Sequence, residues 1–377
     1  MYKKIITPLK ITALTGLSLL VGCSSNAPQK TQDNALTKTS VPQALRLKNI
    51  PHIPSPHWKM VWNDEFNDST IDPKKWSFEE NCWGGGNNEQ QCYTHRKSNA
   101  YIKDGKLNIV AKKGHFTGSA SPDGKSSKTK SLPYTSARLR TMNKGDWKYG
   151  RIEVRAKLPS GQGTWPAIWM LPTDWVYGNW AASGEIDIME SVNLKTPSTE
   201  TGAKSGDLES RVFGTLHYGR NWPNNVFTGQ ATHLPDNANP ADDYHTYAIE
   251  WEKGEIRWYI DGVHYATQKS DGWYSQSVKD GVITSNGPEA PFNQKFHLLL
   301  NVAVGGNWAA NANLGGIDAS VFPQTMSVDY VRVYQCSINP ITGKGCKTDA
   351  PKDQTKLVKG IAEPEVVQKK TSHTKIY

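Results

Sequence analysis

Three carboxylic acids within six residues are the part of this sequence best suited to chemistry. In the segment 184–190, Glu185, Asp187 and Glu190 are interleaved with apolar side chains. Side chains alternate between the two faces of a β-strand, so Glu185 and Asp187 would share one face. A regular strand would turn Glu190 to the opposite face. One extra residue, a β-bulge near Ile188–Met189, would return Glu190 to the face of the other two acids.

Acids arranged in this way could cleave a glycosidic bond. A retaining glycoside hydrolase needs a carboxylate nucleophile and a protonated carboxylic acid about 5–5.5 Å apart. Crowding raises the pKa of at least one of the carboxyl groups, which keeps an acid protonated near neutral pH. The spacing alone equally allows a solvated strand face or a calcium site.

The segments around these acids are short and alternate between apolar and polar residues, with Gly, Asn, Asp and Pro between them. No segment has a long apolar repeat of 3.6 residues with helix caps, and no internal repeat is present. Many short strands without helices predict an all-β sandwich or barrel. The clearest predicted strands are 106–111, 150–158, 246–251, 256–261, 296–302 and 326–334.

Length, composition and charge exclude several classes of protein. The 377 residues, 37% hydrophobic and 21% charged, are not those of a disordered chain as a whole. The net charge of +9 is concentrated at the ends: residues 1–55 carry +6, residues 337–377 carry +4, and the middle carries −1. Basic ends suit an anionic membrane surface or solubility better than a nucleic-acid groove, so no nucleic-acid partner is expected.

The sequence Glu-Ile-Asp-Ile-Met-Glu resembles the active-site signature of glycoside hydrolase family 16 in its bulged form. The resemblance covers roughly residues 58–336. It implies a β-jelly roll, a sandwich of two curved antiparallel sheets with the sugar cleft on the concave face. The other segments that resemble the family are Trp62–Phe66, Asn87–Thr94, Gly163–Trp169, Asn301–Trp308 and Val328–Tyr334.

The resemblance also implies a role for each acid. Glu185 would be the nucleophile, Glu190 the acid/base and Asp187 the assisting acid. The five-position spacing of the two glutamates is that of the laminarinase branch, although galactan-cleaving relatives share it. The implied activity is endo-hydrolysis of β-1,3-glucan with retention and without a cofactor for catalysis. One departure is Gln90, where the family usually has Leu.

Five further residues resemble positions that bind or adjust the substrate in the family, and Trp308 joins them because its Gly-Gly-Asn-Trp loop is expected to be exposed. Tryptophan suits this role because the C–H face of a pyranose packs on a flat π surface. The arginine and the asparagine would hydrogen-bond the sugar, and the histidine would lie near the acid/base and tune its proton transfer. The predicted substrate-binding residues are Trp165, Trp180, Trp308, Arg138, Asn99 and His217.

Family members often bind one structural calcium ion away from catalysis. Glu65, the carbonyl of Gly105 and Asp329 match its usual ligands, and oxygen ligands of this kind suit Ca²⁺. A structural calcium ion is therefore expected, with no part in the reaction.

The N-terminus has the layout of a secretion signal. Three lysines precede an apolar stretch, residues 11–22, that is too short to span a membrane. Its end, Leu-Val-Gly-Cys23, resembles the lipobox of bacterial lipoproteins, which implies removal of residues 1–22 and acylation of Cys23. Ser24 follows, and the absence of Asp there allows sorting to the outer membrane. An ordinary signal peptide is the alternative.

Five cysteines fit this export route. If Cys23 takes lipid, the other four form two pairs, each closing a short loop. Because an exported protein enters an oxidising compartment, we expect two local disulfides. The predicted pairs are Cys82 with Cys92 and Cys336 with Cys346.

Four segments follow from these observations. They are a lipoprotein signal peptide (1–22), a lipidated cysteine with a flexible tether (23–55), a catalytic domain (56–336), and a disulfide-closed end with a Lys-rich, disordered tail (337–377). The expected partners are a polysaccharide substrate and a membrane, reached through the lipid anchor. A monomer is expected.

Three other functions stay open at this point. The first is hydrolysis of a β-galactan such as agarose or carrageenan, although the near-zero charge of the middle segment disfavours a sulfated substrate. The second is a non-catalytic lipoprotein that binds glucan, which would not need all three acids. The third is a transglycosylase, in which a sugar hydroxyl replaces water.

Overall fold

The computed structural model describes residues 44–46, 53–348 and 357–365, which belong to one compact unit. Strands dominate this part of the chain, and its helical structure is limited to two 3-10 turns and one four-residue helix, α1 (Gly306–Ala309). No helix in these ranges is long and apolar enough to cross a membrane. The strands are β1 (Leu45–Arg46), β2 (Trp58–Asp64), β3 (Ser77–Phe78), β4 (Gln91–Tyr93), β5 (Ala100–Lys103), β6 (Lys106–Ser119), β7 (Thr129–Ser136), β8 (Arg138–Arg140), β9 (Asp146–Trp147), β10 (Gly150–Lys157), β11 (Thr164–Pro172), β12 (Glu185–Glu190), β13 (Val212–Gly219), β14 (Asn225–His233), β15 (His245–Glu252), β16 (Glu255–Ile260), β17 (Val263–Lys269), β18 (Gln276–Lys279), β19 (Val282–Ser285), β20 (Phe296–Val304) and β21 (Gln324–Cys336).

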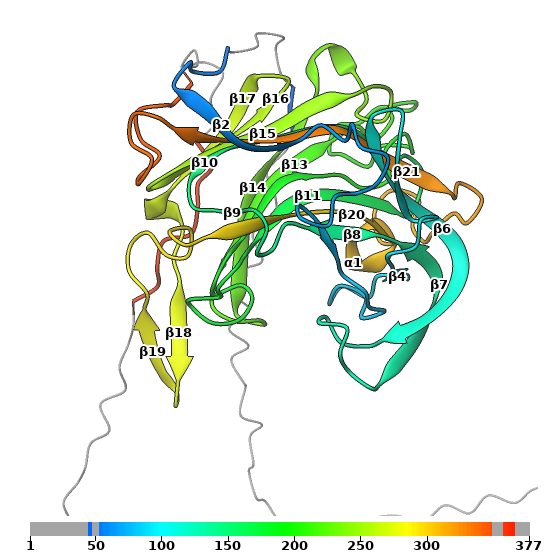
Figure 1. Ribbon diagram of the computed structural model, residues 1–377, viewed down its shortest axis with the longest axis horizontal. Helices are drawn as coiled ribbons and strands as arrows, with labels where there is room; N and C mark the ends of the chain where they lie inside the picture. The colour runs from blue at the N-terminus through cyan, green and yellow to red at the C-terminus, as the bar shows by residue number, and fades with distance from the viewer. Residues whose placement is uncertain (1–43, 47–52, 349–356, 366–377) are drawn as a thin grey trace, which may run out of the picture. The chain divides into compact units, whose positions relative to one another are not determined.

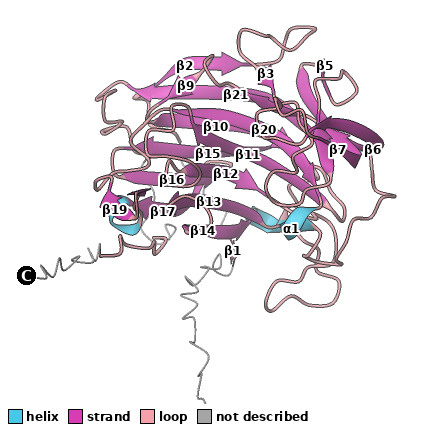
Figure 2. Ribbon diagram, turned by 90° about the horizontal axis from the view of Figure 1, so that it is seen from below, coloured by secondary structure: helices cyan, strands magenta, loops and turns pink. Residues whose placement is uncertain are grey.

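The strands form two large sheets that stack face to face (Figure 1, Figure 2). The nine-stranded sheet has the order β1-β14-β13-β12-β11-β20-β8-β3, with β9 also paired to β20. The ten-stranded sheet has the order β17-β16-β15-β10-β21-β6-β7-β4, with β2 paired to β21 and β5 to β6. Most neighbours are antiparallel, and β18 and β19 form a separate hairpin. The predicted all-β jelly-roll sandwich is confirmed.

The main core lies between the two sheets, because alternate residues of each strand face inward. Ile152 and Val154 from β10 meet Ile168 and Met170 from β11 in this core, and all four are fully buried. The opposite face of the nine-stranded sheet is therefore available for polar side chains, and β12 runs through the middle of that sheet.

All six predicted strands occur, and β6 is the one that differs most in length. The prediction covered residues 106–111, which pair with β21. The strand continues to Ser119 because residues 112–119 leave β21 and pair with β7. That second half is mostly exposed, so its sequence lacks the apolar alternation on which the prediction depended.

The prediction of a disordered tail is wrong for residues 357–365, which pack on the domain. Val358 is buried, and its N–H donates to the carbonyl of Thr267 at 2.8 Å. Ile361 packs against the main core. Within the predicted tether, 23–55, the short strand β1 pairs in parallel with β14. A few apolar residues anchor each end, which average composition did not reveal.

The residues directly after the second disulfide, Cys336–Cys346, contact a buried group of charges on the outer side of the ten-stranded sheet. Glu250 is fully buried and forms ion pairs with Arg151 at 3.2 Å and Arg257 at 3.4 Å. The backbone N–H of Thr348 also donates to Glu250, at 3.0 Å. A buried charge that loses a partner is strongly destabilising, so this segment must stay in place.

Both predicted disulfides are present, and each joins residues ten positions apart. Replacing Cys336 and Cys346 with Ser should lower the free energy of unfolding by about 3 kcal/mol through loop entropy, and further by uncovering Glu250. Urea denaturation measures the loss. The matched control replaces Cys82 and Cys92 with Ser, which opens a loop of equal length without uncovering Glu250. Equal losses of unfolding free energy in the two double variants would show that covering Glu250 contributes nothing to stability.

Candidate active site

The bulge that the sequence predicts is present in β12. Two consecutive residues of β11 pair with Met189 and Asp187, which leaves Ile188 without a partner. The register with β13 is interrupted at the same place. Ile188 and Met189 are both buried in the core. The bulge therefore turns Glu190 to the same face as Glu185 and Asp187, away from the core.

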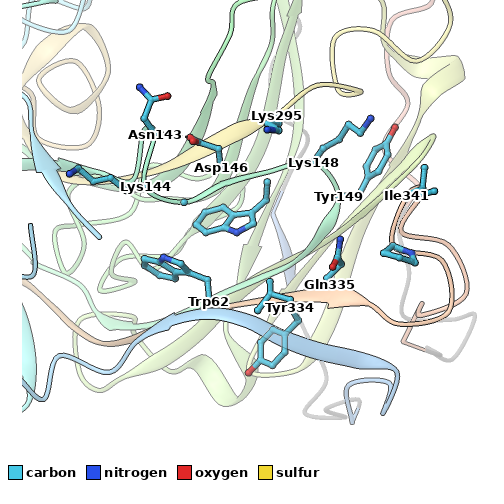
Figure 3. A pocket seen from close by; sticks show the side chains of 14 residues that line it. Trp62, Asn143, Lys144, Asp146, Lys148, Tyr149, Lys295, Tyr334, Gln335 and Ile341 are labelled. Atoms are coloured by element: carbon cyan, nitrogen blue, oxygen red, sulfur yellow. Dashed lines mark hydrogen bonds between the residues drawn. The ribbon is translucent and has the colours of Figure 1, made fainter. Parts of the chain in front are cut away.

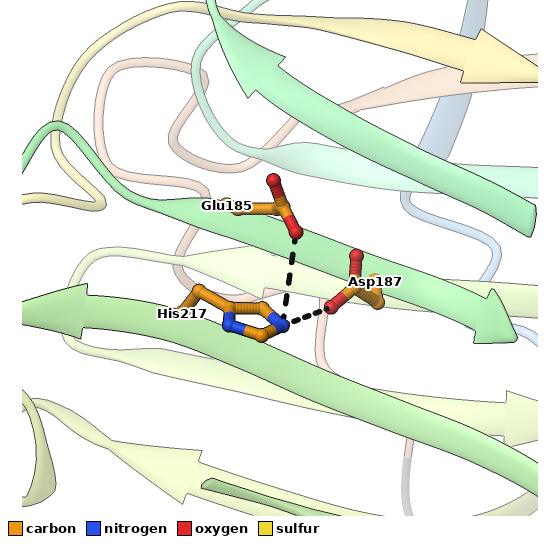
Figure 4. Close-up of side chains that lie close together, drawn as sticks. All are labelled: Glu185, Asp187 and His217. Carbon is orange, nitrogen blue, oxygen red and sulfur yellow. Dashed lines mark ion pairs between the residues drawn. The ribbon is translucent and has the colours of Figure 1, made fainter. Parts of the chain in front are cut away.

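Glu185 and Asp187 form a tight cluster with His217 of β13 (Figure 4). The His217 Nε2 atom lies 3.3 Å from Asp187 Oδ2 and 3.7 Å from Glu185 Oε1. The strand register explains this contact, because Glu185 and His217 are directly opposite each other. His217 lies near the acid/base, as predicted, since it lowers the pKa of Glu190, but its nearest carboxylates are those of Asp187 and Glu185.

The same three side chains are the one group in the described part of the chain whose atoms are spaced as metal ligands could be. Calcium takes oxygen ligands, and one of the three ligands here is an imidazole nitrogen. The cluster therefore does not support the calcium alternative for this strand.

Two tryptophans hold the glutamates by hydrogen bonds. The Trp180 indole N–H donates to Glu185 Oε2 at 2.8 Å, and the Trp165 indole N–H donates to Glu190 Oε1 at 2.8 Å. Both indoles are half-buried, so part of each ring stays open. The sequence predicted them only as sugar platforms. The structure adds a second role, because each fixes one carboxyl group.

All three acids hold their protons more tightly than ordinary carboxyl groups. Burial, with the charge of Asp187 added, raises the pKa of Glu185 to about 8 and the pKa of Glu190 to about 8. Burial also raises the pKa of Asp187 well above its ordinary value. Because crowded carboxyl groups cannot all ionise, the cluster keeps protons near neutral pH. A solvated strand face would not behave in this way.

The charges around the two glutamates differ. His217 lowers the pKa of both glutamates and lies 3.7 Å from Glu185 Oε1, whereas the negative charge of Glu89 helps to raise the pKa of Glu190 alone. Glu89 is buried and accepts a hydrogen bond from Gln91 Nε2 at 2.6 Å. These surroundings leave the pKa of each glutamate at about 8, so they do not by themselves separate a nucleophile from a proton donor. The roles of Glu185 as the nucleophile and Glu190 as the acid/base stay those that the sequence resemblance implies.

Glu89 is a residue of the site that the sequence analysis did not single out. It lies in the loop closed by Cys82 and Cys92, and it pairs in an isolated bridge with Gly305. In the sequence, the only sign of a role for Glu89 was its place in the segment 87–94, which resembles the family. The position of Glu89 beside Glu190 depends on how that loop folds back, which the sequence does not show.

The rings of Trp165 and Trp308 pack closely together and form an aromatic wall beside Glu190. Trp308 in α1 contacts Trp165 edge to face, with ring centroids 5.3 Å apart. Gly306 begins α1 with a φ of +75°, and a Cβ there would lie 3.3 Å from the Trp165 ring. Glycine is therefore required for this approach. Trp308 remains partly exposed on the same wall, as its predicted role requires.

The prediction that Asn99 binds sugar is wrong, because its side chain is fully buried and satisfied by the protein. Its amide nitrogen donates to the Val110 carbonyl at 2.9 Å and to Thr135 Oγ1 at 3.1 Å. Its amide oxygen accepts from Thr94 Oγ1 at 2.8 Å. Asn99 therefore joins three segments of the scaffold.

Arg138 is also largely enclosed by protein. Its guanidinium group lies over the rings of Tyr93 at 4.3 Å and Trp169 at 5.0 Å, and it donates to the Tyr93 hydroxyl at 3.1 Å. An ion pair to Glu79 at 3.4 Å adds to these contacts. These contacts make Arg138 a support for two aromatic side chains, and its contact with sugar stays a prediction.

The predicted calcium ligands Glu65, Gly105 and Asp329 do not present a free set of oxygens. The two carboxylate oxygens of Glu65 accept hydrogen bonds from Arg332, both at 2.9 Å. Asp329 forms an ion pair with Lys106 at 2.9 Å. Calcium needs oxygens that are not already bound to cations. The residues as placed do not fit this ion, and calcium has no part in the chemistry below.

The raised pKa values predict how stability depends on pH. A carboxyl group with a pKa of about 4.5 when unfolded and about 8 when folded keeps its proton only in the folded state between these values. Stability is therefore lost as pH rises from about 4.5 to about 8. The Glu185→Gln/Glu190→Gln variant should have a higher Tm than the unmodified protein at pH 8 and a similar Tm at pH 4. Parallel Tm profiles of the two proteins would contradict this prediction.

Comparisons with known proteins agree with this geometry. The family model described as "Beta-porphyranase A-D, GH16 domain" matches residues 58–336. The chain is 41% identical over 284 residues to "Glucan endo-1,3-beta-glucosidase A1" of Niallia circulans, which covers 73% of this chain and 38% of that protein. It is 39% identical to the "Beta-glucanase" of Rhodothermus marinus, covering 74% of this chain and 86% of that one. The X-ray structure of the laminarinase from Rhodothermus marinus superposes with a TM-score of 0.56 at 38% identity, over 74% of this chain and 98% of that chain.

Proposed function

Because the chain belongs to glycoside hydrolase family 16, we propose that it is an endo-β-1,3-glucanase that cleaves internal bonds of laminarin-type glucans with retention. The bulge in β12 is the observation that carries this proposal, since it brings two buried glutamates with raised pKa values to one face. The names of the two relatives, a glucan endo-1,3-beta-glucosidase and a beta-glucanase, support β-glucan as the substrate.

In the first step, the ionised carboxylate of Glu185 attacks the anomeric carbon while Glu190 gives its proton to the glycosidic oxygen. The bond between the anomeric carbon and that oxygen breaks, the rest of the chain leaves, and the sugar stays bound to Glu185. The Trp180 N–H orients the attacking carboxylate. Asp187 assists from beside the nucleophile, because its carboxylate and that of Glu185 both lie against the His217 Nε2 atom, at 3.3 Å and 3.7 Å.

In the second step, Glu190 acts as a base, because it lost its proton in the first. It takes a proton from water as the water oxygen attacks the anomeric carbon, and the bond to Glu185 breaks. Two inversions give overall retention. The Trp165 N–H stabilises the carboxylate form of Glu190 between the two steps, because a hydrogen bond to the charged form favours it.

A β-galactan substrate is the second candidate, because the matching family model is described as that of beta-porphyranases. Sizing the products from laminarin, mixed-linkage β-glucan, agarose, carrageenan and porphyran decides between them. A ladder of oligosaccharides from laminarin supports the proposal, and products from a galactan alone overturn it. Binding of laminarin without products would favour the non-catalytic alternative. Products longer than the starting sugar chains would identify a transglycosylase.

We also propose that the protein is a monomer anchored by lipid at the outer membrane, with the signal 1–22 removed and Cys23 acylated. These residues lie outside the described ranges, and the sequence pattern alone supports this location. The protein should sediment with membranes, and Cys23→Ala should release it, because several acyl chains on one cysteine give stable anchoring. Ser24→Ala, which keeps the cysteine, is the control. A Cys23→Ala protein that still sediments with membranes would contradict the anchor.

A further inference from the structure

A second groove, away from the acids, is lined by aromatic and hydrogen-bonding side chains (Figure 3). Its volume of about 720 Å³ lies within the range of small-ligand sites, about 300–1,000 Å³. It lies where β2 of the ten-stranded sheet approaches β9 of the nine-stranded sheet. The lining residues that matter here are Trp62, Trp147, Asn143, Lys148, Lys295 and Gln335.

Strand β20 relates this groove to the catalytic acids. Its first residue, Phe296, pairs with Trp147 of the groove. Five residues farther along, Asn301 pairs with Ala167, which in turn pairs with Glu190. At about 3.3 Å per residue, the groove and the acid/base are about 16 Å apart along the strand. The groove is therefore separate from the acids but lies on the same scaffold.

The tryptophans of the groove pack against the core on one side, where Trp62 also meets Trp76 at 5.8 Å and Lys75 at 5.9 Å, and keep their indole N–H groups for a ligand. The rings of Trp62 and Trp147 meet edge to face with centroids 5.4 Å apart, and both are half-buried. Trp165, Trp169 and Trp180 at the catalytic site all donate their indole N–H to protein oxygens. The indole N–H groups of Trp62 and Trp147 make no hydrogen bond within the described ranges, and neither is a buried unpaired group.

Some polar residues of the groove are likewise available, whereas Lys144 donates to the Pro73 carbonyl and Asp146 accepts from Thr173. Lys148, Lys295 and the Gln335 side chain are exposed, and none has an ion pair or side-chain hydrogen bond to a described residue. Together with the indoles they offer more donors than acceptors. The hydroxyl and ring oxygens of a sugar chain accept hydrogen bonds, and its C–H faces pack on indole rings.

We propose that this groove is a second, non-catalytic binding site for a segment of the same β-glucan chain that the acids cleave. The inference rests on the proposed function, because that function supplies a polymer long enough to reach both sites. Binding at two sites on one chain raises the overall affinity without new contacts in the cleft. Long glucans should therefore bind more tightly than short oligosaccharides that occupy the cleft alone.

The test measures binding in the inactive Glu185→Gln background, with long-chain laminarin and with laminaritriose. Adding Trp62→Ala should weaken laminarin binding by about tenfold and leave laminaritriose binding unchanged. Because Trp62 packs against the core, a second variant, Lys148→Ala/Gln335→Ala, removes only exposed side chains and should show the same selective loss. Lys103→Ala, an exposed lysine on β5, is the control and should change neither affinity.

The outcomes are distinct. Selective loss for laminarin in either groove variant supports a second site. Unchanged laminarin binding in both variants, or equal loss for laminarin and laminaritriose, overturns it. If the Glu185→Gln protein binds neither glucan, the proposed function has failed, and the groove variants are not needed to show it.

Discussion

Replacing Glu185 with Ala is expected to lower the rate of laminarin hydrolysis by about 10⁴-fold or more, because the covalent intermediate can no longer form. Laminarin binding and Tm near pH 5 should stay close to those of the unmodified protein. The Trp180 indole would lose one acceptor but keep its half-buried position. Initial rates on laminarin, with purified variant and unmodified enzyme, measure the loss.

Azide makes this test specific for the nucleophile. With an activated aryl β-glycoside, azide can occupy the space left by the Glu185 carboxylate and attack from the side opposite the leaving group. The expected product is therefore an α-glycosyl azide. Asp187→Asn, which keeps the nucleophile, is the matched control and should give no such product. If Glu185→Ala retains substantial turnover, or yields only β-glycosyl azide, Glu185 is not the nucleophile.

The catalytic strand could be predicted from sequence because its information is local. Alternation along β12 places Glu185 and Asp187 on one face, and the number of residues up to Glu190 demands a bulge. The same pattern places the bulge near Ile188–Met189, and Ile188 is the residue that the pairing leaves out. The sandwich was predictable for a similar reason, since each short strand carries its own apolar alternation.

The neighbours of the acids could not be predicted in the same way, because they depend on register and on loop packing. His217 lies against Glu185 because β12 and β13 pair in one particular register. Asn99 looked like a sugar ligand, but its amide is used between strands that are distant in sequence. Glu65 looked like a calcium ligand until Arg332, 267 residues away, was seen to occupy its carboxylate. Residue type alone does not show that another protein group already binds a carboxylate or an amide.

Replacing Glu190 with Gln is expected to affect the two steps of the reaction unequally. Cleavage of laminarin needs a proton on the leaving oxygen, so its rate should fall by about 10²–10⁴-fold. An aryl β-glycoside with an acidic leaving group needs no such proton, and its first step should be nearly unaffected. Each enzyme molecule should then release one phenol in a burst as its glycosyl-enzyme forms. The glycosyl-enzyme should accumulate, because Glu190 is also needed to activate water.

The surroundings of Glu190 allow the proton-transfer role to be tested separately from structure. Glu89→Gln removes a nearby negative charge that helps to raise the pKa of Glu190, so the alkaline limb of the activity profile should move to lower pH. In Glu190→Gln that limb should disappear, and added azide should yield a β-glycosyl azide. Equal losses on laminarin and on the activated glycoside would mean that Glu190 does not donate the proton. The acid would then have to be another group on the same face, and Asp187, buried and with a raised pKa, is the only carboxylic acid of β12 besides the two glutamates.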